Sequence, residues 1–516
     1  MKRDPLTQRL QWPLTLALCA GTYIALLSIR HLEALRTFVI VLGVLAGLQV
    51  FNRDTLRRNA PAARALSASW LTVLVIATLV VQWFHDFRQY YWMRAEIFRP
   101  EMASMHWPLY GRELPATVVG WFVVPTVAAG SIFALRRLLG QSRTFWNVAA
   151  FSAVFVAINA IAFAMSDADR TLGVEPLAPD QMFIRDAAKF DGTLDLLRNY
   201  AAMMPKLSWF GAHYPPGHAW LSMQLGTRVE LLHFASVLAL PGLVFLAARR
   251  LTRDGSVATM SALLAATGGL MLVLATLIST SSVAALGAAG LWLGAVAIDR
   301  NTTAARRLVA GAGLGLLVAG WSLLSFSVLY WAISAVLLMA GLVVVKRASV
   351  KHAAASLAVS LATFAIALLG LKLLGYDTLE VLQIATAEHH RQIGGVKSPP
   401  HVMMEEWLLR SIGNVLAFVL GHLPLMCLAF LGLGWPGEHR KIARLIGGSA
   451  LLVLVAAGFS GTFIIETERI WIFWVPAFCI AGGTVLAQQT RREQLWLISI
   501  AFLSGVAMEL CYRPYL

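Results

Sequence analysis

Charged side chains are scarce in this chain. Asp, Glu, Lys and Arg make up 13% of the 516 residues, whereas hydrophobic residues make up 58%. Soluble domains contain about 25% charged residues, so the composition excludes a soluble globular protein. Apolar runs of about 18–22 residues recur instead, and each is long enough to cross a hydrocarbon core about 30 Å thick. The sequence therefore predicts an all-α, polytopic membrane protein.

Cysteines are also few. The four cysteines lie in or beside apolar runs, without the spacing of metal ligands: Cys19, Cys427, Cys479 and Cys511. We expect them to be small core residues. Residues 1–12 are basic, but the apolar run after them is interpreted as a retained first span and not as a secretory signal. No residue pattern indicates a cofactor, and a divalent metal is not indicated but stays open.

About fifteen apolar runs are predicted to span the membrane. They cover 13–29, 37–52, 66–84, 116–135, 145–165, 231–248, 257–276, 283–298, 308–325, 327–345, 353–374, 412–433, 448–465, 470–488 and 494–510. A polar segment after the fifth run divides the chain into three parts. These are N-terminal membrane helices (1–165), an outer loop with an interfacial helix (166–230), and C-terminal membrane helices (231–516) with a second outer loop at 376–410.

Basic residues are in excess, with a formal net charge of +15. In a polytopic protein this excess marks cytoplasmic loops, so we expect membrane lipids and no nucleic acid as partners. The Arg and Lys clusters then place the N-terminus in the cytoplasm, provided that the run 215–226 does not span. Because that run is short and begins with two prolines, we predict an interfacial or re-entrant helix. The long polar connections therefore face the exoplasmic side, where we expect the chemistry.

Six aspartates lie in the first outer loop: Asp167, Asp169, Asp180, Asp186, Asp191 and Asp195. A carboxylate held at a membrane surface is suited to act as the general base for a hydroxyl group. Asp191 and Asp186 are the strongest candidates, because they precede an amphipathic run that can lie on the membrane surface. The alternative is that these aspartates are solvated or cap helices.

A stiff joint ends the same loop. Its two prolines restrict the backbone, and its glycine permits a close approach of another chain segment. We predict that it shapes the acceptor side of the site, the alternative being an ordinary entry into the next helix. The joint consists of His213, Tyr214, Pro215, Pro216, Gly217 and His218.

Basic side chains at three further places are candidates for binding a lipid phosphate. They are Arg198 in the first outer loop, the group His389, His390 and Arg391 in the second, and Arg469 at the head of a late span, close to Glu466. The two histidines lack a third and fourth ligand, so we do not expect a metal there. The alternatives are a solvated loop and, for Arg469, a snorkelling side chain paired with a nearby glutamate.

Together these features resemble the glycosyltransferase C (GT-C) superfamily of polytopic enzymes, such as protein O-mannosyltransferases and lipid A aminoarabinose transferases. Three features carry the resemblance: an acidic outer loop at Asp191 leading to Tyr214-Pro215-Pro216, a following span ending at Arg249 and Arg250, and a late span beginning Arg469-Ile470-Trp471 with Pro476 after it. The chain departs from the family in having five spans before the acidic loop, Gly192 in place of a second acidic residue, and His213-Tyr214 in place of a lysine.

The resemblance implies an inverting glycosyltransferase of the cell envelope, acting at the exoplasmic face. Its donor would be a sugar linked to polyprenyl phosphate, and its acceptor a hydroxyl of a lipid, glycan or protein. Asp191 or Asp186 would be the base, and Arg469 would stabilise the leaving phosphate with help from Arg198 or the histidine group. Two alternatives stay open: a transporter or flippase for a lipid-linked solute, and a noncatalytic relative that has lost the acidic pair.

Overall fold

The computed structural model describes most of the chain from residue 111 onward. The described residues are 111–112, 118–139, 144–165, 178–268, 281–393, 411, 414–415, 418–419, 422–434, 439–460, 471–511 and 513–514. The predicted spans 13–29, 37–52 and 66–84 lie outside them.

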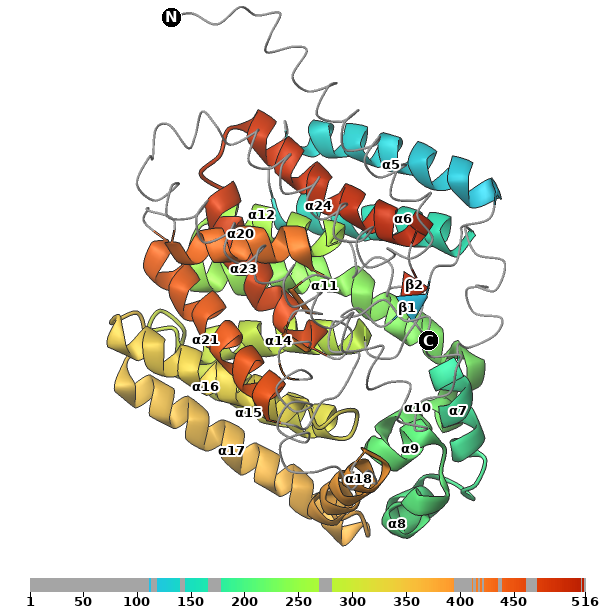
Figure 1. Ribbon diagram of the computed structural model, residues 1–516. Helices are drawn as coiled ribbons and strands as arrows, with labels where there is room; N and C mark the ends of the chain where they lie inside the picture. The colour runs from blue at the N-terminus through green and yellow to red at the C-terminus, as the bar shows by residue number, and fades with distance from the viewer. Residues whose placement is uncertain are drawn as a thin grey trace, which may run out of the picture.

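The described part is a bundle of apolar helices (Figure 1). The helices are α5 (Val118–Leu139), α6 (Phe145–Met165), α11 (Val229–Thr252), α12 (Gly255–Thr267), α14 (Ser281–Ile298), α15 (Ala304–Ser322), α16 (Val328–Val344), α17 (Val350–Leu373), α20 (Leu423–Gly434), α21 (Arg440–Phe459), α23 (Val475–Leu486) and α24 (Arg491–Cys511). Among the described residues, five stretches are long and apolar enough to cross a membrane, namely Phe122–Leu139, Phe145–Met165, Gly217–Thr252, Val350–Leu373 and Arg440–Phe459. The chain is thus an all-α, polytopic membrane protein, as predicted; one two-residue ladder, β1 (Gly111–Arg112) with β2 (Arg513–Pro514), accompanies the helices.

Small residues hold the centre of the bundle together. Every residue of α12 is buried except the first two, and all of α23 is buried. A Cβ added at Gly483 of α23 would lie 2.2 Å from the Ser261 hydroxyl of α12, and one at Gly432 of α20 would lie 2.4 Å from the Ala481 carbonyl. Because lipid tails are as apolar as the helices, such close backbone packing is what favours association inside a membrane.

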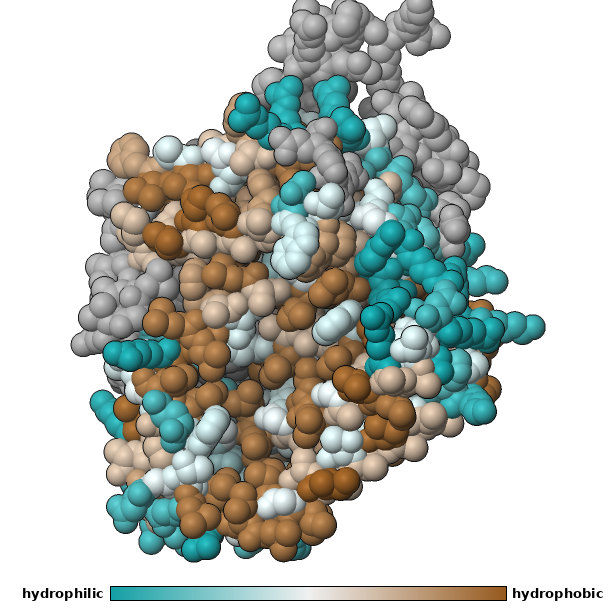
Figure 2. All heavy atoms as spheres, turned by 180° about the vertical axis from the view of Figure 1, so that it is seen from behind, coloured by the Kyte–Doolittle hydropathy of each residue, from teal (hydrophilic) through white to brown (hydrophobic). Residues whose placement is uncertain are grey.

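One end of the bundle is rich in basic residues that contact acidic ones. Asp299, after α14, accepts from Arg250 at 3.0 Å and from Arg253 at 3.2 Å. Asp254 caps α12 through the Ser256 amide and also contacts His439, before α21, at 2.9 Å. The segments after α11, after α14 and before α21, which the charge pattern assigned to one side of the membrane, therefore contact one another. Figure 2 shows the broad hydrophobic surface between hydrophilic edges that a membrane protein needs.

The opposite end carries a layer of short helices. They are α7 (Ala178–Ala187), α8 (Thr193–Met203), η2 (Met204–Lys206), α9 (Trp209–His213), α10 (Gly217–Leu225), η3 (Gly226–Arg228) and α18 (Thr378–Ile393). Buried side chains from both predicted outer loops form its core, among them Leu196, Tyr200, Tyr376 and Val381. We call these helices the outer layer. The two predicted loops thus fold together, although Leu196 and Tyr376 are 180 residues apart in sequence.

The run 215–226 forms a short helix of its own. α10 has nine residues, so it is about 14 Å long and cannot cross the hydrocarbon core alone. Gly226 separates it from α11 with φ 55°, a conformation that glycine adopts readily. That this run does not span the membrane stays a prediction, because α10 and α11 together form the candidate span Gly217–Thr252.

Candidate active site

The carboxylate of Asp186 lies inside the outer layer. Asp186 is 1% exposed and forms an ion pair with Lys189 at 3.0 Å. The Ser208 amide donates to both carboxylate oxygens, at 2.9 and 3.0 Å, and the Ser208 hydroxyl donates to one of them. A Cβ at Gly211 would lie 2.2 Å from this carboxylate, so only glycine fits there. These contacts anchor the start of α9.

This geometry corrects the interpretation of Asp186 as a candidate base. A general base needs an oxygen that an acceptor hydroxyl can reach, and both oxygens of Asp186 are already engaged by the protein. Asp186 is therefore better explained as the residue that positions the chain between α8 and α9.

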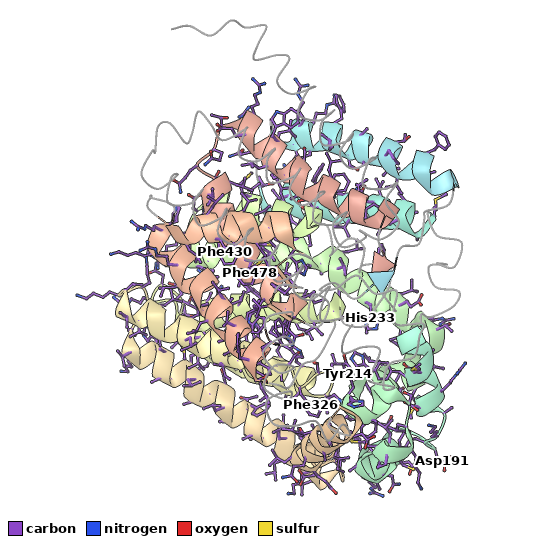
Figure 3. The ribbon with its side chains drawn as sticks, in the orientation of Figure 1. Asp191, Tyr214, His233, Phe326, Phe430 and Phe478 are labelled. Atoms are coloured by element: carbon purple, nitrogen blue, oxygen red, sulfur yellow. The ribbon has the colours of Figure 1, made fainter. Side chains whose placement is uncertain are left out.

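Asp191 has the opposite environment. It is exposed at the start of α8, and its carboxylate makes no hydrogen bond or ion pair with the residues that the structure describes. Asp195 holds the turn instead, accepting from the Asp191 amide at 2.9 Å and from Asn199. These two donors keep the pKa of Asp195 below its usual value. Figure 3 shows Asp191 at the edge of the outer layer, with Tyr214, His233 and Phe326 further in.

The Pro-Pro-Gly joint is docked on the turn between α15 and α16. The Gly217 amide donates to the Leu323 carbonyl at 2.6 Å, and a Cβ at Gly217 would lie 2.3 Å from that oxygen. Pro215 and Pro216 are buried beside it. The predicted close approach at this glycine is thus confirmed, and it joins the outer layer to the membrane helices.

Tyr200, which the sequence did not single out, fastens this joint from the other side. Its buried hydroxyl lies 3.0 Å from the carbonyls of both Gly211 and Tyr214. Burial, with smaller effects of Tyr376 and Asp186, raises its pKa well above the usual value, so the hydroxyl stays protonated and can donate. A tyrosine in an amphipathic helix shows no such partner in the sequence, because both carbonyls are more than ten residues away.

Removal of this hydroxyl gives a first prediction. In Tyr200→Phe, two buried carbonyls lose their common donor, so we expect the protein to be less stable by about 1–3 kcal/mol. The measurement is the midpoint of thermal aggregation in detergent. An unchanged midpoint would mean that water replaces the hydroxyl.

Next to the joint lies a buried cluster of aromatic and imidazole rings. His218 stacks on Phe183 at 4.8 Å between ring centres, and Tyr214 packs edge-on against both. His233 of α11 lies 6.5 Å from His218 and shares a 2.6 Å hydrogen bond with Ser282. The Leu324 backbone is near the His218 ring but outside good hydrogen-bond geometry. The cluster makes the joint rigid.

Arg198 lies where the outer layer meets α17. Its side chain packs on Gly375, whose φ is 102° and whose missing Cβ would lie 2.5 Å from Arg198 Cγ. The exposed guanidinium forms no ion pair within the described part of the chain. On the same turn, Lys372 pairs with Asp377 at 2.9 Å, and this contact holds the pKa of Asp377 below its usual value. Two cationic groups therefore lie close to the outer end of α17.

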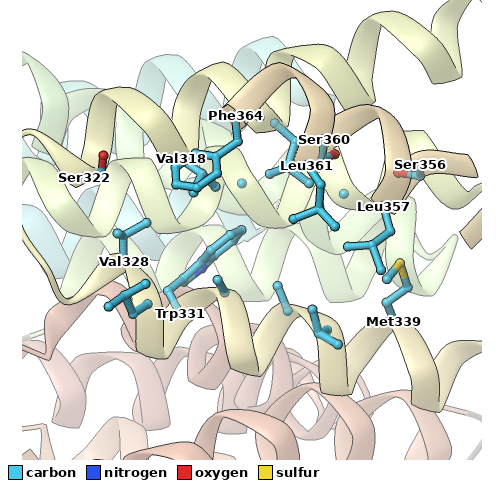
Figure 4. Close-up of a pocket in the computed structure, with 18 of the residues that line it drawn as sticks. Val318, Ser322, Val328, Trp331, Met339, Ser356, Leu357, Ser360, Leu361 and Phe364 are labelled. Atoms are coloured by element: carbon cyan, nitrogen blue, oxygen red, sulfur yellow. The ribbon is translucent and has the colours of Figure 1, made fainter. Parts of the chain in front are cut away.

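An apolar groove begins beside these cations. It encloses about 410 Å³ and runs between α14, α15, α16 and α17 to α18 (Figure 4). Thr378 and Leu379 line its outer end, and Leu368, one turn before Lys372, is also part of the wall. Its lining is apolar apart from four hydroxyl side chains: Ser322, Ser356, Ser360 and Thr378. The liners Leu329 and Leu361 are also half exposed, so the groove opens sideways onto the outer surface of the bundle.

The structure describes only some of the remaining predicted site residues. Arg469 and Glu466 lie outside the described residues, as do Asp167 and Asp169. His389, His390 and Arg391 lie on α18, but their side chains are outside the described part. Among the residues that the structure describes, no three His, Cys, Asp or Glu side chains gather as metal ligands would.

Comparison with known proteins finds similar folds. No family model and no curated protein matches the chain. Among solved structures, it is similar to an Archaeoglobus fulgidus oligosaccharyltransferase in complex with Zn and sulfate (16% identity, TM-score 0.47, covering 70% of this chain and 53% of that one). It is also similar to ArnT from Cupriavidus metallidurans in the apo state (17% identity, TM-score 0.43, covering 66% and 60%).

A third solved structure is AglB, the archaeal oligosaccharyltransferase from Archaeoglobus fulgidus, in complex with an inhibitory peptide and a dolichol-phosphate. It shares 14% identity and a TM-score of 0.46, covering 71% of this chain and 55% of that one. The chain spans between half and two thirds of the length of these three proteins.

Proposed function

We propose that the chain is an integral-membrane glycosyltransferase that transfers a sugar from a polyprenyl-phosphate carrier to an acceptor hydroxyl. The apolar groove, with the exposed Arg198 on the turn beside its outer end, carries the proposal. A groove that opens sideways to the bilayer can take up a hydrocarbon tail through van der Waals contacts, and a guanidinium near its outer end suits a phosphate. The combination matches a lipid-linked donor better than a soluble one.

In the proposed reaction, Asp191 accepts the proton of the acceptor hydroxyl as its oxygen attacks the anomeric carbon. The bond between this carbon and the phosphate oxygen breaks, and the configuration is inverted. Arg198 offsets the charge that develops on the leaving phosphate, an electrostatic contribution that often dominates catalysis. Arg469, His389, His390 and Arg391 remain proposed as further phosphate contacts, and the joint His213–His218 with Glu466 as the acceptor side.

The outer layer is the proposed exoplasmic face, with the N-terminus in the cytoplasm. The ion cluster around Asp299 lies at the other end of the bundle and collects the Arg residues expected in cytoplasmic loops. The acceptor would be a lipid, glycan or protein that approaches this layer from outside.

A transport assay and a transfer assay separate this function from its main rival. Purified protein in liposomes is given a panel of polyprenyl-phosphate sugars with mixed envelope acceptors. An enzyme releases polyprenyl phosphate and forms a glycosylated product. Movement of the intact donor across the bilayer without release would favour a flippase, and neither result would favour a noncatalytic relative.

The guanidinium at the groove mouth gives a second prediction. In Arg198→Gln, the loss of one charge near the leaving phosphate should lower kcat/KM by about 10–10²-fold. Arg185→Gln is the matched control, because Arg185 is an exposed arginine of α7 in the same layer, whereas Arg198 packs on the turn at Gly375 beside the outer end of the groove. Equal losses in the two variants would contradict a specific role of Arg198.

A further inference from the structure

The groove has a depth that can be traced along α16. Its liners on this helix run from Val328 to Leu342, which is about 21 Å at 1.5 Å per residue. The inner liners Leu251 and Ile298 lie within a few residues of the ion pairs of Asp299. The groove therefore crosses most of a hydrocarbon core about 30 Å thick.

Three glycines line this groove, and they differ in what surrounds them. A Cβ at Gly290 would meet the Trp331 ring at 2.4 Å, and one at Gly315 would meet the Ser360 carbonyl at 2.4 Å. These two glycines are needed for packing between helices. At Gly294 the nearest atom to a Cβ would be Leu314 Cδ2, at 4.0 Å. The missing side chain of Gly294 therefore leaves space that belongs to the groove.

Gly294 lies in the inner half of the groove. It is the fourteenth residue of α14, so it lies about 20 Å along the axis from the outer start of that helix and about 6 Å from its inner end at Ile298. A chain that enters beside α18 passes most of the groove before it reaches Gly294. Only the deeper part of a long tail can therefore contact this position.

The charge near the outer end of the groove favours a lipid that carries a phosphate. The exposed Arg198 packs on the turn at Gly375, three residues before the groove liner Thr378. Its guanidinium complements the phosphate at the head of one long tail, whereas Lys372 is already paired with Asp377.

We propose that Gly294 sets the depth of a binding groove for one polyprenyl tail, so that the protein selects carriers by the length of their hydrocarbon chain. The proposal rests on the proposed function for the identity of the lipid. It adds a selecting residue about 20 Å along α14 from the outer start of that helix, in the inner half of the membrane bundle. Short carriers occupy only the outer part of the groove, and long carriers fill it.

The test is a binding measurement with two sugar-free lipids, a C10 and a C55 polyprenyl phosphate, by competition against a fluorescent lipid phosphate in detergent. Gly294→Leu fills the inner groove without meeting a protein atom at its Cβ. We expect it to weaken C55 binding by about 10–100-fold, because the Leu side chain takes the place of several methylenes of the tail and removes their packing contacts, and C10 binding by less than about twofold. Gly320→Leu is the matched control, since Gly320 is an exposed helical glycine outside the groove with no atom within 4 Å of its Cβ position.

Three results would overturn the proposal: equal losses for the two lipids in Gly294→Leu, unchanged C55 binding, or the same loss in Gly320→Leu. Competition by a two-chain phosphatidate as strong as that of C55 polyprenyl phosphate would also overturn it, in favour of a phospholipid site. Because no sugar is present, the result is independent of catalysis. If the lipids bind as expected and no transfer is found with any donor, the proposed function fails while the depth selection stands.

Discussion

Asp191→Asn is expected to lower sugar transfer by about 10²–10⁴-fold, the usual contribution of a general base. The amide has nearly the shape of the carboxylate but cannot accept the proton of the acceptor hydroxyl. The side chain is exposed and the turn is held by Asp195, so the variant should fold and insert normally. Transfer from a polyprenyl-phosphate sugar, measured per mole of purified protein, checks this.

The neighbouring carboxylate of Asp195 is the control for this variant. Asp195→Asn removes a partly exposed charge four residues away and weakens the turn before α8, so a small loss of stability is expected with most of the turnover kept. Near-normal turnover in Asp191→Asn would eliminate Asp191 as the base. The base would then have to be sought among the other acidic residues of the outer loops.

The positions of the membrane helices were predictable because the hydrophobic effect largely determines them. α6 has the bounds predicted from its apolar run, Phe145–Met165, and α11, α14 and α17 begin and end within a few residues of theirs. α21 differs, beginning at Arg440 and not at 448, because its first turns carry basic residues that a search for apolar runs omits. Removal of apolar side chains from water is nearly independent of partners, so hydropathy alone locates such helices.

The site was less predictable because its contacts are between distant residues. The sequence indicated both Asp186 and Asp191 as candidate bases. In the structure the carboxylate of Asp186 is buried and accepts hydrogen bonds from Ser208, 22 residues later, whereas Asp191 is exposed. The sequence also indicated that both outer loops share one face, without showing that they form a common core or that Arg198 meets Gly375. The spacing of small residues along α14 did not reveal the groove, since it depends on four helices at once.

The two carboxylates of the outer layer have different roles: Asp186 holds the structure, and Asp191 is the proposed base. A buried, fully bonded Asp186 keeps α9 and the Pro-Pro-Gly joint in place, and the joint in turn rests on the turn between α15 and α16. Phe326, at that turn, lines the groove and packs against the outer-layer core. A change at the buried carboxylate should therefore reach the groove through packing.

Asp186→Asn tests this division and should act on stability more than on chemistry. The amide leaves the Lys189 ammonium without its partner and places an NH₂ group against the Ser208 amide, and breaking a buried ion pair on one side costs about 3–5 kcal/mol. We expect a much lower thermal midpoint in detergent and poor yield. Protein that does fold should keep its turnover per folded molecule, counted by size-exclusion peak area.

Lys189→Met separates charge from packing at the same place. This variant removes the ammonium but leaves the three hydrogen bonds from Ser208, so it should destabilise the protein less than the loss of the carboxylate if the anchoring of α9 matters most. A normal thermal midpoint together with a turnover loss above about 10²-fold in Asp186→Asn would contradict the structural role. It would restore Asp186 as the base, because an anchoring carboxylate affects the amount of folded protein before it affects the chemical step.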